Sequence, residues 1–258
     1  MIEPNLIWPI VAAPFVGSFL GVLIIRLPAG TPLAMVRSAC QHCGTALGPL
    51  DLVPLISFVV LRGRCRYCGG NIGLFHPAVE LAALGIAILA VLGDPDPGWA
   101  WVACALGWTL LTLAWIDWTD FLLPDVLTLP LLLGGLVLTR IWDPDSLTDH
   151  CLAAALAYLS FRGIAVVYRL LRGRDGLGGG DAKLFAAAGA WCGLGALPLV
   201  VLGSAVIGLL AALGLALAGR NMTSTTRIPF GPCIALAFWL VWTQGTLADD
   251  LLQLLESS

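Results

Sequence analysis

One uninterrupted apolar run, from Ala182 to Gly219, constrains the fold of this chain more than any other feature, and Lys183 is its only charged residue. As a single α-helix the run would be about 57 Å long, because each residue adds about 1.5 Å. The hydrocarbon core of a bilayer is only about 30 Å thick. We therefore expect the run to fold back on itself between Gly193 and Pro198 and to form two membrane spans.

The rest of the chain has the same apolar character. Of its 258 residues, 59% are hydrophobic and 11% are charged, whereas a soluble domain carries about 25% charged residues. We therefore expect an all-α fold, a polytopic membrane bundle of about eight transmembrane helices. The first apolar run lacks the basic start and cleavage site of a signal peptide, so we expect it to remain in the protein. The further predicted spans are Leu6–Ile25, Pro77–Leu92, Trp99–Ile116, Phe121–Thr139, Cys151–Leu171 and Ile228–Trp242.

The basic residues predict an orientation in the membrane. They gather in the polar region 26–76, around residues 172–183 and in the segment 220–227, while the turns 94–98 and 143–149 contain none. Short loops rich in Lys and Arg mark the cytoplasmic side. Both chain ends then lie outside, and a short break predicted at Asp117–Asp120 lies on the cytoplasmic side.

Two acids at the edges of spans are the candidate site. Asp181 follows Gly178-Gly179-Gly180 directly, and Asp117 ends the third predicted span on the same membrane face. A carboxylate at the mouth of a span is costly and is by default a functional candidate. Two such acids can share a proton and activate water, as in aspartic proteases. The alternatives are that Asp117, Asp120, Asp125 and Asp181 are loop or helix-cap residues facing water, or that the acids serve proton or cation transport.

Four of the eight cysteines form two closely spaced pairs in the region 26–76. Cys40-x-x-Cys43 and Cys65-x-x-Cys68 are typical of a four-thiolate zinc site, and such a site is structural because the protein fills every coordination position. Nearby arginines can offset the negative charge. Two disulfides are the alternative, but disulfides belong in oxidising compartments, and the arginines predict a cytoplasmic location. The other cysteines lie in or beside apolar runs and are expected to pack as small hydrophobic residues.

These motifs together resemble a known family. Gly178-Gly179-Gly180-Asp181 resembles the Gly-x-Gly-Asp motif of the membrane aspartyl proteases. Nearly the whole chain is similar to the bacterial type IV prepilin peptidases, also called prepilin leader peptidase/N-methyltransferases. The segments that carry the similarity, besides the cysteine pairs and the Asp117 segment, are Gly17-Ser18-Phe19-Leu20, Arg26-Leu27-Pro28, Pro54-Leu55-Ile56-Ser57, Gly63-Arg64-Cys65-Arg66-Tyr67-Cys68, Pro77-x-x-Glu80, Leu123-Pro124-Asp125 and Ile228-Pro229-Phe230-Gly231-Pro232.

The resemblance implies an endopeptidase of the bacterial inner membrane. Its partners would be prepilins or type II secretion pseudopilins and the lipid bilayer, with no nucleic acid, and the leader would be cut at the cytoplasmic face. Asp117 and Asp181 would be the catalytic pair. The residues that would support the motif are Gly178, Gly180, Lys183, Asp120 and Asp125. The implied domains are a first span (1–25), a cytoplasmic four-cysteine region for methyl transfer (26–76) and a transmembrane peptidase domain (77–258).

The same resemblance implies a second activity, methylation of the new N-terminus by S-adenosylmethionine. Gly63, Arg64 and Glu80 fall at positions associated with it, although no glycine-rich nucleotide fingerprint shows this cofactor independently. Two positions depart from the family pattern. Arg64 stands where the family has lysine, which changes the hydrogen-bond geometry, and Gly21 stands where it usually has asparagine. A peptidase without methyltransferase activity is therefore an alternative.

Overall fold

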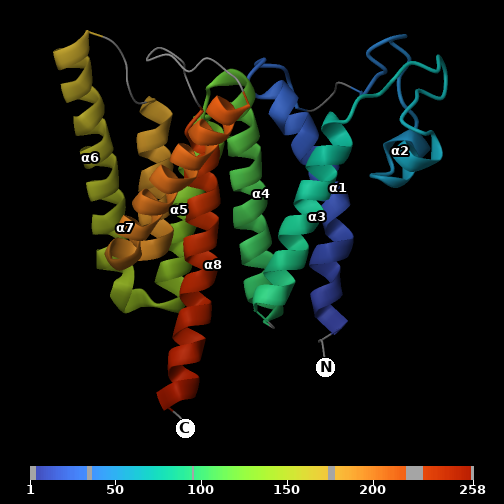
Figure 1. Cartoon of the computed structure of the whole chain (residues 1–258). Helices are drawn as coiled ribbons and strands as arrows, with labels where there is room; N and C mark the ends of the chain where they lie inside the picture. The colour runs from blue at the N-terminus through green and yellow to red at the C-terminus, as the bar shows by residue number, and fades with distance from the viewer. Residues whose placement is uncertain (1–3, 34–36, 95, 174–177, 219–228, 257–258) are drawn as a thin grey trace. The chain divides into compact units, whose positions relative to one another are not determined.

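The computed structural model describes residues 4–33, 37–94, 96–173, 178–218 and 229–256, and these residues are almost entirely helical (Figure 1). Three short 3-10 helices, Pro4–Leu6, Pro49–Leu52 and Pro144–Ser146, accompany the α-helices. Within the described ranges no strand forms beyond two isolated bridges. The α-helices are α1 (Ile7–Arg26), α2 (Ile56–Val60), α3 (Phe75–Gly93), α4 (Pro97–Asp120), α5 (Asp125–Trp142), α6 (Leu147–Arg172), α7 (Gly179–Leu217) and α8 (Gly231–Glu256).

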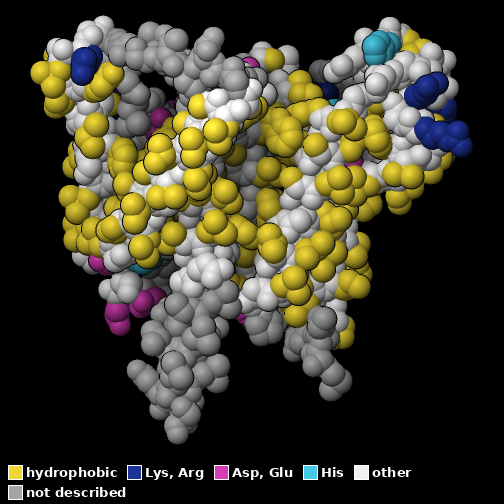
Figure 2. Space-filling view, viewed as in Figure 1, with side chains coloured by type: hydrophobic (Ala, Val, Ile, Leu, Met, Phe, Trp, Pro, Cys, Tyr) yellow, Lys and Arg dark blue, Asp and Glu magenta, His cyan; other side chains and the backbone are white. Residues whose placement is uncertain are grey.

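The expected polytopic membrane fold is confirmed. Six helices in the described part of the chain, α1 and α3 to α7, are long and apolar enough to cross a membrane. Their outer surfaces are covered by hydrophobic side chains, which Figure 2 shows in yellow. The predicted number of about eight counts the run that forms α7 as two spans and adds one more span at 228–242.

The helix α7 divides at Gly193, as the length of its apolar run predicts. Gly193 has φ 71° and ψ 179°, which is not helical and which glycine adopts readily. Phe230 lies against Phe185, with ring centroids 6.2 Å apart, and a Cβ at Gly208 would also lie 3.2 Å from its ring. In a straight helix, residues 185 and 208 would be about 35 Å apart. The chain therefore reverses direction within α7, as Figure 1 shows.

The first half of α7 packs unusually closely on α6. A Cβ placed on Gly189 would lie 2.6 Å from the backbone carbonyl carbon of Ala153. We expect Gly189→Ala to destabilise the protein by about 1–3 kcal/mol, because the overlap is with backbone that cannot move aside easily. Gly163→Ala on α6 is the control, because its Cβ would meet no atom within 4 Å. Thermal unfolding in detergent measures both variants, and equal midpoints would contradict this packing.

Helix boundaries near the first acid differ from the prediction. The break predicted at Asp117–Asp120 is wrong, because α4 continues through Asp120. The predicted start of the next span at Phe121 is also wrong. Phe121 adopts a left-handed conformation with φ 53°, and Pro124 is extended, so α5 begins only at Asp125. Near the C-terminus, the predicted start Ile228 lies outside the described residues, and α8 continues beyond the predicted end at Trp242 to Glu256.

The chain forms two compact units, Met1–Thr112 and Leu113–Ser258, with the boundary inside α4. In the first unit α1 lies close to α3, because a Cβ at Gly17 would be only 2.7 Å from the Glu80 Cα. The second unit contains the end of α4 and all of α5 to α8, and therefore holds both candidate acids. The predicted boundary between the methyl-transfer region (26–76) and the peptidase domain (77–258) is a functional boundary, and it remains a prediction.

Candidate functional site

Asp117 lies in the last turn of α4 and is only 6% exposed. Its Oδ2 accepts a hydrogen bond of 2.8 Å from the backbone N–H of Gly231, the first residue of α8. The first N–H groups of a helix lack partners within that helix, and the positive end of the helix dipole favours a carboxylate there. The start of α8 therefore holds one oxygen of Asp117 in a fixed position.

Asp181 is held in a similar way. It lies in the first turn of α7 and is 8% exposed, and its Oδ2 accepts a hydrogen bond of 3.2 Å from the Gly178 N–H. Asp181 lies close enough to Asp117 for their carboxyl groups to interact electrostatically, and Cys233 in the first turn of α8 lies within the same range of both. The second unit thus brings the two acids together, although they are far apart in the sequence.

The absence of a side chain at Gly231 permits this arrangement. A Cβ on Gly231 would lie 2.7 Å from Asp117 Oδ2, too close for any real contact. We expect Gly231→Ala to displace the carboxylate and to lower activity at this site at least tenfold, because small misplacements of reacting groups are costly. Gly195→Ala, where a Cβ would meet nothing within 4 Å, is the control. Unchanged activity of Gly231→Ala would show that this hydrogen bond does not position Asp117.

The residues predicted to support the motif have different surroundings. A Cβ at Gly180 would lie 2.8 Å from the Leu123 Cβ, so this glycine permits close packing. Lys183 Nζ donates a hydrogen bond of 2.5 Å to Asp125 Oδ1. Asp120 is exposed and accepts a hydrogen bond from the Thr119 hydroxyl. Its exposure separates it from the two buried acids.

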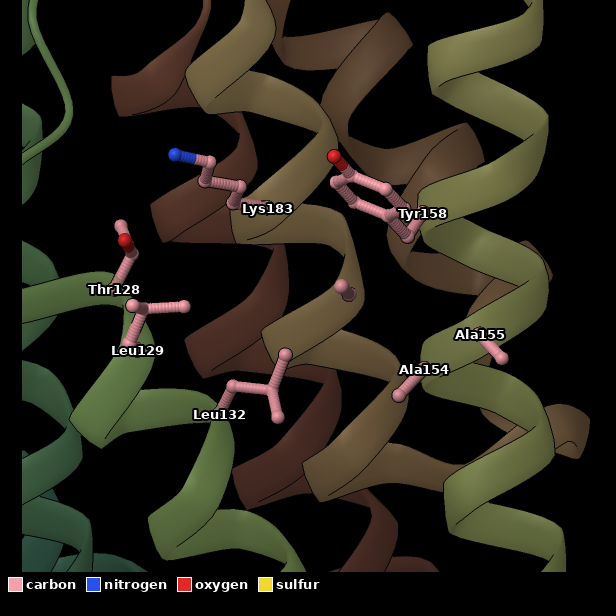
Figure 3. Close-up of a pocket in the computed structure, with 8 residues that line it drawn as sticks. Thr128, Leu129, Leu132, Ala154, Ala155, Tyr158 and Lys183 are labelled. Carbon is pink, nitrogen blue, oxygen red and sulfur yellow. The ribbon is translucent and has the colours of Figure 1, made fainter. Parts of the chain in front are cut away.

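A pocket of about 330 Å³ lies between α5, α6 and α7, and Figure 3 shows its lining. It is lined by Thr128, Leu129, Leu132, Ala154, Ala155, Tyr158, Lys183 and Ala186. Lys183 follows Asp181 by two residues, and two residues turn a helix by about 200°. The pocket therefore lies on the opposite face of α7 from Asp181 and is separate from the acid pair.

The four paired cysteines converge in the first unit. Their sulfur atoms all lie within 4.8 Å of one another, and the Sγ atoms of Cys40 and Cys68 are 3.9 Å apart. A tetrahedral zinc site with Zn–S distances of about 2.3 Å has sulfur atoms about 3.8 Å apart. Hydrogen bonds with Thr45 lower the pKa of Cys43 to about 6, whereas burial and the neighbouring cysteine thiols raise the pKa of Cys68 to about 11, so the case for a metal rests on the sulfur positions. The donor set therefore fits zinc.

The two cysteine pairs have matching backbones. Gly44 donates its N–H to Cys40 O and Gly69 donates to Cys65 O, and both glycines have φ 70°. Isolated bridges, Ala39 with Ala46 and Arg64 with Asn71, close the two turns. All eight thiols of the chain are free, and the four sulfurs meet at one point instead of pairing as two disulfides. The repeated turn is thus a local structure suited to presenting two thiolates.

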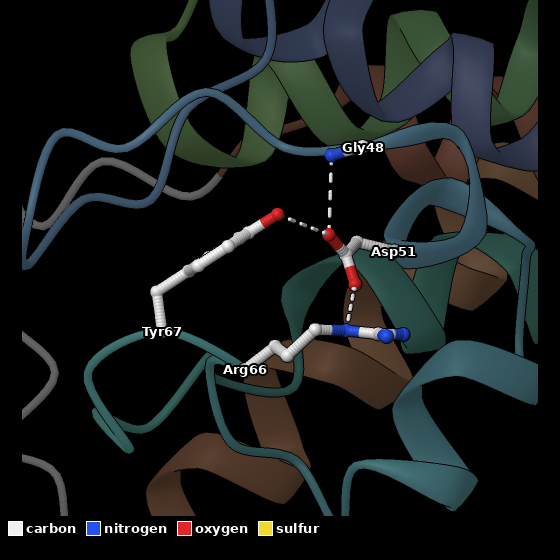
Figure 4. A network of polar contacts seen from close by, with 4 residues as sticks. All are labelled: Gly48, Asp51, Arg66 and Tyr67. Atoms are coloured by element: carbon white, nitrogen blue, oxygen red, sulfur yellow. Dashed lines mark hydrogen bonds and ion pairs between the residues drawn. The ribbon is translucent and has the colours of Figure 1, made fainter.

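Sequence reasoning missed the residue that anchors the second cysteine turn. Asp51 accepts hydrogen bonds from the Gly48 N–H at 3.1 Å, from Arg66 Nε at 2.7 Å and from the Tyr67 hydroxyl at 3.4 Å (Figure 4). Arg66 and Tyr67 lie between Cys65 and Cys68. Arg66 therefore pairs with Asp51, and the Asp51 network ties the cysteine turn to the 3-10 helix Pro49–Leu52.

The residues linked to methyl transfer also lie in the first unit. Glu80 is 5% exposed on α3, and its Oε2 accepts a hydrogen bond of 2.8 Å from the Leu55 N–H. Gly63 has φ 68°, and Arg64 is exposed beside the cysteine turn. A Cβ at Gly21 would lie 2.8 Å from His76 Nδ1, so the imidazole ring occupies the space next to this glycine.

The fold and the acid pair define a class, a polytopic membrane protein with two buried carboxyl groups at helix ends. Sequence comparison gives the family. The profile described as "Bacterial Peptidase A24 N-terminal domain" matches residues 11–93, and that of the "Type IV leader peptidase family" matches residues 104–213. The chain belongs to the type IV leader peptidase family. No solved structure matches it significantly.

Curated relatives match the chain over most of its length. The prepilin leader peptidase/N-methyltransferase of Aeromonas hydrophila is 40% identical over 257 residues, covering 89% of this chain and 87% of the relative. The protein of the same name from Pseudomonas aeruginosa is 38% identical with the same coverage. That from Burkholderia pseudomallei is 41% identical over 259 residues, covering 90% of this chain and 82% of the relative. The family resemblance inferred from the motifs is confirmed, and the chain is an inner-membrane protein.

Proposed function

We propose that this protein is an aspartic endopeptidase that removes the leader of prepilins or pseudopilins and then methylates the new N-terminus. The observation that supports the peptidase activity most is the pair of buried acids. Asp117 on α4 is bonded to the start of α8, and Asp181 lies at the start of α7. Membership of the type IV leader peptidase family supports the substrate class. Neither alternative, a transporter or a peptidase without methyl transfer, is favoured by relatives whose name includes both activities.

In the proposed reaction the two acids share one proton and bind one water molecule. The ionised carboxylate takes a proton from the water while the water oxygen attacks the scissile carbonyl carbon, and the protonated acid donates to the carbonyl oxygen. The tetrahedral intermediate then breaks its C–N bond: the leaving amine takes the proton that the first acid gained from the water, and the second acid regains its proton from a hydroxyl group of the intermediate. Backbone N–H groups of Gly231 and Gly178 hold one oxygen of each acid, which leaves the second oxygen for the water.

For the methylation step we propose S-adenosylmethionine as the methyl donor, with Gly63, Arg64 and Glu80 as candidate residues. When bound, it supplies an electrophilic methyl group. Glu80 fits a cationic ligand, because this buried carboxylate forms no ion pair with any described residue. Its contacts are the Leu55 N–H and the Ser18 side chain. In this role Glu80 binds a positive group and orients it.

We further propose that the four cysteines bind one structural Zn²⁺ and that this region and the acid pair face the cytoplasm. Figure 2 supports the orientation within the second unit, where basic side chains lie at one end of α6 and acidic side chains at the other. Arg169 and Arg172 are in the last turn of α6, and Asp149 is in its first. Basic residues near span ends favour the cytoplasmic side.

The proposed function is tested by incubating the purified protein, in liposomes, with a full-length prepilin and S-adenosylmethionine carrying a labelled methyl group. We expect the product to lack its leader and to carry the label on its new N-terminal nitrogen, as mass spectrometry of the product would show. Cleavage without label would identify a peptidase alone. An intact prepilin, processed in parallel by a curated relative, would contradict the proposal.

A further inference from the structure

The two acids are brought together by contacts that the acids themselves do not make. Asp117 lies in the last turn of α4 and Asp181 in the first turn of α7, and the backbone N–H groups of Gly231 and Gly178 orient each carboxylate separately. Neither hydrogen bond joins the segment of one acid to the segment of the other. A direct link between the two acids can come from contacts between residues 117–125 and the first turn of α7, in addition to the packing of Phe230 on Phe185.

The segment after Asp117 is well suited to such a link because it is short and tightly folded. Phe121 donates its N–H to the Asp117 carbonyl as the last helical hydrogen bond of α4 and adopts φ 53°, so the chain leaves the helix four residues after the acid. Pro124, whose ring fixes its own φ angle, is extended and directly precedes the start of α5 at Asp125. Asp125 is thus joined to Asp117 by a short segment that contains two constrained residues, Phe121 and Pro124.

This segment contacts α7 on both sides of Asp181. Leu123 is 7% exposed and lies against Gly180, the residue before the acid. Asp125 Oδ1 accepts the 2.5 Å hydrogen bond from Lys183 Nζ, two residues after the acid. Figure 3 shows the Lys183 side chain extending from α7 toward the α5 side of the pocket, where Thr128 lies. A packing contact and an ion pair thus bracket Asp181.

The ion pair contributes little to stability. The side chains of Lys183 and Asp125 are 32% and 57% exposed, and exposed pairs are weakened by water and salt. Lys183 is nevertheless the only charge besides Asp181 in the long apolar helix α7. A charge in such a helix is costly and marks function by default. These two facts favour a role in geometry over a role in folding.

We propose that the Asp125–Lys183 ion pair is a positioning element that holds Asp117 and Asp181 at the separation needed to share one water molecule. Neither residue of the pair touches the substrate in this role. Each acts through the segment to which it belongs, Asp125 through residues 117–125 and Lys183 through the first turn of α7. This inference rests on the proposed peptidase function of the two acids.

The test is a double-mutant cycle on prepilin cleavage in liposomes, with kcat and KM measured separately. We expect Asp125→Asn and Lys183→Gln each to lower kcat about tenfold or more with KM nearly unchanged, because misplaced groups react slowly. The double variant should be no slower than either single variant, since both remove the same link. Lys183→Arg should retain most activity. Asp145→Asn, an exposed acid beyond the far end of α5, is the matched control.

Three outcomes would overturn the positioning role. One is wild-type kcat in both single variants. Another is a double variant whose fold-decrease in kcat equals the product of the two single decreases, which would mean that the residues act separately. The third is a raised KM with unchanged kcat, which would make Lys183 a substrate-binding residue. Thermal midpoints matched to wild type exclude loss of folding. Failure of the peptidase proposal is distinguishable, because the wild-type protein would then not cleave at all.

Discussion

Replacing Asp181 with asparagine is expected to abolish leader cleavage while leaving the protein folded. Asparagine has nearly the same shape and keeps an oxygen that can accept the Gly178 N–H, but it can neither take nor give the proton that the reaction requires. The loss of an acid–base group lowers rates by about 10²–10⁴-fold. Asp117→Asn should have a similar effect, and the double variant should be little worse than either single one, because the two acids act as a unit.

The measurement is the rate of prepilin cleavage, and methyl transfer provides its internal control. A synthetic peptide that begins at the mature N-terminus needs no cleavage, so the Asp181→Asn variant should still methylate it at the wild-type rate. Asp145→Asn should cleave normally, because this acid is exposed and lies beyond the end of α5. Normal cleavage by either Asp117→Asn or Asp181→Asn would show that the two acids do not act together as the catalytic pair.

The sequence predicted those features that depend on length and spacing. The run from Ala182 to Gly219 was too long for one span, and the reversal at Gly193 follows. The spacing of the cysteine pairs predicted a common site, and their sulfurs converge. Asp117 and Asp181 were paired by counting spans, because each lies at a span end on the same predicted face. These inferences need only the thickness of a bilayer and the geometry of a metal site.

The features that were missed depend on local conformation or on contacts distant in sequence. The polar residues within Asp117–Asp120 predicted a loop. The helix instead continues until Phe121, which takes a left-handed conformation shortly before Pro124. The contact of the Gly231 N–H with Asp117 joins residues far apart in the chain. Asp51 likewise reaches Arg66 across the cysteine region. No periodicity in the sequence reports such pairings.

Removing one thiolate of the cysteine cluster is the second substitution for which we expect a large effect. We expect the wild-type protein to contain about one zinc per chain and Cys65→Ser to contain almost none. Cys65 is buried, and the other three thiolates alone leave one coordination position open. Structural zinc binding contributes about 10–16 kcal/mol in small zinc-finger peptides, so we expect most of the order of this small loop-rich region to depend on the proposed ion.

Loss of the metal should then expose the region 26–76 to proteases. Between α1 and α3 the described helices are limited to Pro49–Leu52 and Ile56–Val60, so little regular structure would hold this region together without the metal. Trypsin should cut the Cys65→Ser variant rapidly after Arg62 and Arg64, whereas the wild-type protein should resist until a chelator removes its zinc. Cys151→Ser, which changes an exposed thiol on α6, should keep both zinc and resistance. Zinc retained at the wild-type level in Cys65→Ser would show that the four sulfurs converge without holding a metal.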